Sequence, residues 1–110
     1  MINWRLLNDD IIVIDNKNIE CEYEVDKFLK YVEDDSTTNC IDLIEKVYVR
    51  ENNEFMFKID FLKKTFDYTL KSENITVQDK IVSQITIENN KINLKYELDK
   101  EAKEIIIQLL

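Results

Sequence analysis

Closely spaced carboxylates begin at position 20 of this chain. Glu20, Glu22 and Glu24 are separated by single uncharged residues, and Asp26 follows. Alternate side chains of a β-strand point to the same face, so the three glutamates would form a row of like charge. Such a row is either a solvated edge that prevents aggregation or a surface that recognises lysine and arginine side chains of a partner.

A second acidic run, Glu33-Asp34-Asp35, lies further along the chain. Together with the first group it could form one continuous negative patch. A patch of this kind can imitate the phosphates of a nucleic acid and occupy the basic groove of a protein that binds nucleic acid. We therefore place a partner-binding site on these seven residues. The expected partner is a basic protein, in particular a nucleic-acid-binding effector.

Carboxylates also bind divalent cations through their oxygen atoms. The candidate turns are Asp9-Asp10 with Asp15, and Glu33-Asp34-Asp35. Neither spacing matches an EF-hand loop, which also uses a glycine that this chain lacks. Solvated acidic turns are the simpler interpretation, and a hydrolase that uses two carboxylates is a further alternative. We expect no metal and no cofactor.

Three residue types are missing from the 110 residues, namely histidine, glycine and proline. Without histidine, a Ser-His-Asp or Cys-His arrangement cannot form, and a zinc site loses its usual nitrogen ligand. Without glycine, the phosphate-binding loop and the dinucleotide fingerprint are absent. The sequence therefore favours a protein that works by binding over an enzyme. The two cysteines, Cys21 and Cys40, are either free thiols or a single bridge.

The negative charge is concentrated in the first part of the chain. Residues 1–46 carry 12 acidic and 5 basic side chains, whereas residues 47–110 carry 11 and 10. This imbalance opposes direct binding to nucleic acid or to an anionic membrane, because like charges repel. A basic protein surface is the natural complement.

The hydrophobic pattern predicts a single domain over residues 1–110 with an α+β fold. Val25, Phe28, Leu29 and Val32 have helical spacing, which predicts an amphipathic helix over residues 24–34. Alternating apolar residues from Val47 onward predict an antiparallel β-meander, a curled sheet or open barrel on which the helix packs. Asn52-Asn53 and Asn89-Asn90 are expected as two-residue hairpin turns with positive φ, because asparagine is the best substitute for glycine there. Aromatic residues of the meander are expected in the core, or around a cavity.

Isoleucine, asparagine and lysine are abundant, and Ala102 is the only alanine. These choices indicate an AT-rich coding sequence, as in a low-GC bacterium or its phage. In size and charge the chain resembles phage anti-defence proteins, anti-CRISPRs among them, and toxin-immunity proteins as a class. The leading hypothesis is a cytoplasmic protein inhibitor from a phage or bacterial conflict system. The alternative is a small β-barrel that binds an apolar ligand, and an exposed final strand at 105–107 would allow a homodimer.

Overall fold

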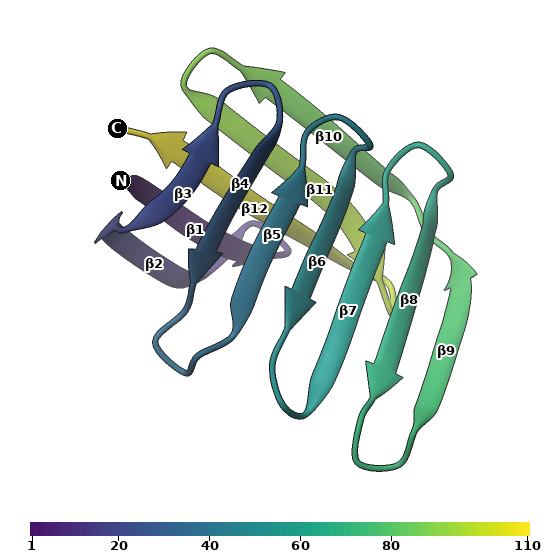
Figure 1. Ribbon diagram of the computed structural model, residues 1–110. Coiled ribbons are helices and arrows are strands. Elements are labelled where there is room, and N and C mark those ends of the chain that lie inside the picture. The colour runs from purple at the N-terminus through teal and green to yellow at the C-terminus, as the bar shows by residue number, and fades with distance from the viewer. The chain divides into compact units, whose positions relative to one another are not determined.

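The computed structural model describes residues 1–110 and contains twelve β-strands and no helix (Figure 1). The strands are β1 (Ile2–Asn8), β2 (Ile11–Ile19), β3 (Cys21–Glu24), β4 (Phe28–Val32), β5 (Thr38–Asp42), β6 (Val47–Glu51), β7 (Phe55–Asp60), β8 (Thr65–Leu70), β9 (Ile75–Lys80), β10 (Ser83–Glu88), β11 (Lys91–Leu98) and β12 (Glu101–Leu109). The protein has no helix long and apolar enough to cross a membrane.

The chain divides into two compact units, each built on one antiparallel sheet. One unit, Cys21–Lys80, holds a seven-stranded sheet in which β3 to β9 follow one another in chain order. The other unit combines Met1–Glu20 with Ile81–Leu110 and holds a five-stranded sheet of order β10-β11-β12-β1-β2. Each sheet is open, so each has two edge strands.

The seven-stranded sheet buries one of its faces. A row of directly opposed residues crosses the sheet from Leu29 through Ile41 and Tyr48 to Ile59. None of these four side chains is exposed to solvent. Opposed residues point to the same face of a sheet, so this register gathers the large apolar side chains on one side. Each such burial stabilises the fold by about 1.5–3 kcal/mol.

The five-stranded sheet follows the same rule around its central strand, β12. Trp4 lies opposite Ile107, and Ile107 lies opposite Ile92. All three side chains are buried. Because β12 is paired on both sides, by β1 and β11, the final strand is not an exposed edge. The sequence suggested a homodimer through an exposed final strand, and the structure has no such exposed strand at 105–107.

The α+β prediction is wrong, because residues 24–34 form no helix. They contain the end of β3, a tight turn at 25–27 and the strand β4. Val25, expected on the buried side of the helix, lies in the turn and is 66% exposed, whereas Leu29 and Tyr31 alternate with exposed residues. The segment is short and rich in β-branched and aromatic residues, and its pairing with β3 and β5 outweighs the helical spacing.

Tight turns often need residues with positive φ, a conformation that glycine adopts most easily and that this glycine-free chain must assign to other residues. Ten residues other than glycine have positive φ, and six of them are aspartate or asparagine, the types that tolerate this conformation best. They are Asp9, Asp10, Asn18, Asp26, Ser36, Lys46, Lys64, Asn74, Asp99 and Lys100. The Asn89-Asn90 hairpin is confirmed in length, since β10 ends at Glu88 and β11 begins at Lys91. The expected positive φ is found at neither asparagine pair, and the turn after β6 has three residues, Asn52–Glu54.

Two turns of the seven-stranded sheet repeat one design, eighteen residues apart. The segments are Ile41–Lys46 and Ile59–Lys64, each beginning Ile-Asp and ending in a lysine with positive φ. In the first, Asp42 Oδ1 accepts hydrogen bonds from the backbone N–H groups of Ile44 and Glu45, both at 2.9 Å. In the second, Asp60 accepts equivalent bonds at 3.1 and 2.9 Å. The aspartate side chain thus closes a turn for which the backbone alone lacks partners.

We predict that Lys100→Gly stabilises the protein. Asp99 and Lys100 form the two-residue turn between β11 and β12 with φ of 53° and 66°, and glycine at the second position removes the left-handed strain of a side-chain-bearing residue. The free energy of unfolding in urea should rise by about 0.5–1 kcal/mol, after the entropic cost of the added glycine. Lys95→Gly, within β11, is the control and should lower it; a loss of stability in Lys100→Gly would contradict the turn assignment.

Candidate partner-binding site

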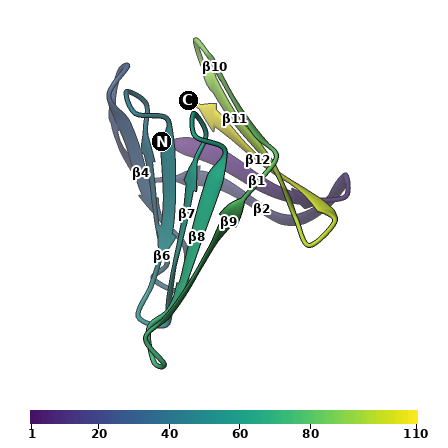
Figure 2. The ribbon, with the colours of Figure 1, turned by 90° about the vertical axis from the view of Figure 1, so that its right-hand side faces the viewer.

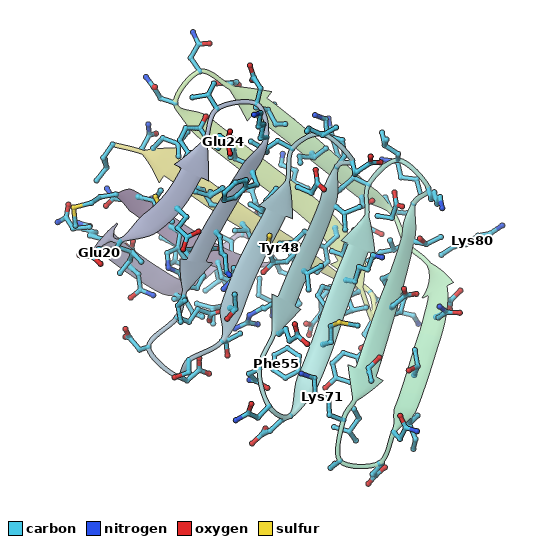
Figure 3. The ribbon with its side chains drawn as sticks, viewed as in Figure 1. Glu20, Glu24, Tyr48, Phe55, Lys71 and Lys80 are labelled. Atoms are coloured by element: carbon cyan, nitrogen blue, oxygen red, sulfur yellow. The ribbon has the colours of Figure 1, made fainter.

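The structure does not bring the seven predicted carboxylates together. Glu24 and Asp26 lie at one end of β4, and Asp34 and Asp35 lie in the loop that leaves its other end. A five-residue strand spans about 15 Å, so these are two separate groups. Glu20 directly precedes β3, and Glu24 ends it; Figure 3 labels both residues.

The glutamates of β3 have basic neighbours. Glu22 lies directly opposite Lys30 of β4. The carboxylate of Glu24 pairs with the Lys27 ammonium at 2.8 Å. Lysines therefore compensate the row of like charge that the sequence pattern suggests, which is how this edge strand is tolerated.

The Glu33 carboxylate takes part in a network of hydrogen bonds inside the seven-stranded unit. Its two carboxylate oxygens accept hydrogen bonds from Nε and Nη2 of Arg50, each at 2.7 Å. One of them also accepts a bond from the Asn39 amide at 2.7 Å, and Asn39 in turn accepts one from the Tyr48 hydroxyl at 2.5 Å. The Glu33 side chain is only 8% exposed, so the charge of Arg50 balances a nearly buried carboxylate.

Three connections at one end of the seven-stranded sheet form an acidic rim. We define the acidic rim as residues 33–37, 50–54 and 71–74; Figures 1 and 2 show these turns at the same end of the strands. It carries six carboxylates and two basic groups, a net charge of −4, whereas the opposite end, residues 24–27, 42–46 and 60–64, carries five and four, a net charge of −1. The turns of the rim recur at every second strand, about 10 Å apart.

Three carboxylates of the rim are exposed and make no hydrogen bond or ion pair within the protein. They belong to Asp34, Glu54 and Glu73, one on each connection. The other acids are held: Glu33 by Arg50, and Glu51 by Lys71 at 2.8 Å. The rim thus presents three spaced negative charges on a surface that its internal ion pairs keep in place.

Asp35 also belongs to the exposed charge of the rim. The hydroxyl and the backbone N–H of Thr37 donate hydrogen bonds to its carboxylate, and both bonds lower the pKa of Asp35 below its usual value. Thr37 is fully buried, and its hydroxyl accepts a bond from the Asn52 amide at 3.1 Å, which ties the first connection of the rim to the second.

Aromatic side chains lie beside the rim. The Arg50 guanidinium lies 5.9 Å from the centre of the Phe55 ring, and Phe55 stacks on Tyr68 with ring centres 6.0 Å apart. Tyr68 is 37% exposed. Figure 3 shows Phe55 and Lys71 at this end of the sheet. An exposed aromatic next to fixed charges is the composition of an interface anchor.

The sequence pattern identified only part of this site. Glu33, Asp34 and Asp35 were among the predicted residues, whereas Glu54 and Glu73 fall in the part of the chain whose net charge is close to zero. The sequence did contain a pattern that locates these two residues. Each of them lies between two segments whose alternating apolar residues predict strands. Grouping every second hairpin turn would have placed them together.

The two cysteines do not form a disulfide. Cys21 and Cys40 are free and point to opposite faces of the sheet, since Cys21 shares a face with Tyr31 and Cys40 shares one with Lys30. Partial burial raises the pKa of the Cys40 thiol.

An open hollow of about 410 Å³ on β7 to β9 is lined by three lysines, three aspartates, a threonine and a glutamine, a composition that suits polar ligands.

We predict that Arg50→Leu lowers the free energy of unfolding by about 2–4 kcal/mol, because the substitution leaves the Glu33 carboxylate nearly buried and without its charge partner. Adding Glu33→Gln should restore part of the loss. Lys71→Leu, which removes a half-exposed pair with Glu51, is the control and should cost less than about 0.5 kcal/mol. Equal losses in the two leucine variants, measured in urea, would refute the special role of the Glu33 network.

We also predict that Thr37→Val raises the pKa of Asp35 toward the ordinary value of 3.8. The lowered pKa means that ionised Asp35 stabilises the folded protein above its ordinary pKa. That contribution is lost as the pH falls through the folded-state value. Carboxyl NMR titration of the wild type and the variant measures the shift. An unchanged Asp35 pKa in the variant would show that the Thr37 hydroxyl has no part in it.

No group of three or more cysteine, aspartate or glutamate side chains is arranged to hold a metal ion. Comparison with protein-family models, with curated proteins and with solved structures gave no match to this chain. The function is therefore inferred from its residues and their geometry.

Proposed function

We propose that this protein acts by binding a basic protein, and that the acidic rim is the surface that makes the contact. The observation that carries the proposal is the set of three exposed carboxylates, Asp34, Glu54 and Glu73, which have no partner within the protein. Arg50 and Lys71 neutralise Glu33 and Glu51 within the protein, whereas these three carboxylates are available to lysine and arginine side chains of a partner.

The geometry of the rim supports a partner that normally binds nucleic acid. Its charges recur along a line at intervals of about 10 Å, and sheet hydrogen bonds hold the turns that carry them. A rigid row of negative charge complements a basic groove, which attracts it at long range and binds it in place of phosphates. The protein would then act as a stoichiometric inhibitor of that partner, as in a phage or bacterial conflict system.

The chemistry of Asp35 supports the same proposal. Its pKa is lowered by Thr37, so this carboxylate stays charged to a lower pH than an ordinary aspartate does. The exposed Tyr68 ring beside the rim supplies an apolar contact that charge alone lacks. Binding through such a surface depends strongly on salt and weakly on cofactors or metals.

Charge reversal at the rim tests the proposal. Asp34→Lys, Glu54→Lys and Glu73→Lys together should abolish capture of a basic partner from bacterial lysate, since three attractive sites become repulsive. The wild type should recover the partner at low salt and release it as salt rises. The captured protein should also lose its binding to nucleic acid when the wild type is added in equimolar amount.

The matched control carries the same change of charge on β3 and on the residue that precedes it. Glu20→Lys, Glu22→Lys and Glu24→Lys alter the net charge equally and leave the rim intact. This variant should retain capture. Loss of capture in the β3 variant alone would move the site to β3, and equal recovery by all three proteins, independent of salt, would refute an electrostatic partner surface.

A further inference from the structure

One edge of the seven-stranded sheet is fully open. β9 is paired only with β8, and all six of its residues are exposed, Ile75 by 50% and Val77 by 52%. Its register with β8 runs without a bulge from Leu70↔Ile75 to Thr65↔Lys80. Figure 1 shows it as the last strand of its sheet. A straight strand with unpaired N–H and C=O groups on one side is a template for another strand.

Two of the other edges, β3 and β2, carry features that protect them. β3 displays Glu22 and Glu24, and β2 has two register shifts against β1, which bend an edge strand. β10, like β9, pairs without an irregularity, and its charged residue is Glu88. β9 begins with four uncharged residues, Ile75 to Gln78, and keeps a regular register along its whole length.

We propose that two copies of this chain pair through β9 as antiparallel strands, joining their seven-stranded sheets about a two-fold axis at Val77. For one continuous sheet, paired residues must point to the same face, so each residue meets one an even number of positions away. Centred on Val77, this register places Val77 against its copy and Thr76 against Gln78. It opposes Asn74 to Lys80 and Ile75 to Asp79, so no like charges meet.

The charges of the sheet favour this antiparallel arrangement. Near β9, the acidic rim carries Glu54, Glu73 and one lysine, Lys71. The opposite end carries three lysines, Lys63, Lys64 and Lys80, and two aspartates, Asp60 and Asp79. An antiparallel pair places the rim of one copy beside the lysine-bearing end of the other, on both sides of the axis. Glu73 of one copy then lies in the turn next to Asn74, the residue that faces Lys80 of the other copy. A parallel pairing would bring like charges together.

Sedimentation equilibrium of the full chain tests the association. The wild type should have the mass of a dimer at high micromolar concentration, and Val77→Lys should raise the dissociation constant by about tenfold or more. Thr86→Lys, which puts the same charge on the β10 edge, is the control and should still dimerise. A wild type that stays monomeric up to millimolar concentration would overturn the proposal and leave β9 to a strand of another protein. A Val77→Lys variant that dimerises like the wild type would also overturn it.

Cysteine cross-linking tests the register. In a Cys21→Ser, Cys40→Ser background, Val77→Cys should form an intermolecular disulfide on mild oxidation. Directly opposed Cα atoms lie about 4.5–5.5 Å apart, within the range that a disulfide spans. Ile75→Cys is almost equally exposed, but its two copies would lie four positions apart along the strands, about 13 Å, and should not cross-link. Equal cross-linking of both variants would refute the Val77-centred pairing.

Discussion

The fold depends on tight turns that must be made without glycine. Twelve strands require a reversal of the chain at nearly every connection, and nine of the ten residues with positive φ lie in these connections; the tenth, Asn18, lies in β2. Aspartate is the recurrent solution, because its carboxylate can accept the turn's backbone N–H groups as Asp42 and Asp60 do. The acidity of the chain is thus partly a consequence of its turn chemistry. The same turns fix the register that gathers Leu29, Ile41 and Tyr48 on one buried face.

Register also separates the charges into two ends of the seven-stranded sheet. Every second turn along the chain lies at the same end of the sheet. The residues in alternate turns therefore decide how much negative charge each end carries. At the rim, Glu33 and Arg50 form a nearly buried pair that Asn39 and Tyr48 extend into the protein. This network holds the first two connections in place. The exposed acids are therefore carried by a stiff support, which lowers the entropic cost of meeting a partner.

The sequence allowed some elements to be predicted and misled on others. Alternation after Val47 and the Asn89-Asn90 pair correctly indicated antiparallel hairpins, because period-two patterns in strands of six to eight residues are hard to mistake. The segment 24–34 misled, because four apolar residues at helical spacing also fit a turn followed by a short strand, in which Leu29 and Tyr31 are buried. The sorting of acids into two ends was not predictable from linear charge, since Asp34, Glu54 and Glu73 meet only through strand order.

Carboxyl footprinting of the purified complex tests the central claim, that the acidic rim is the binding surface. A carbodiimide and an amine label exposed carboxylates, and mass spectrometry compares each site in the free and the partner-bound protein. Asp34, Glu54 and Glu73 should be strongly protected on binding, with Asp26 and Glu45 at the opposite end labelled as in the free protein. Protection confined to Asp26 and Glu45, with the rim still labelled, would contradict it.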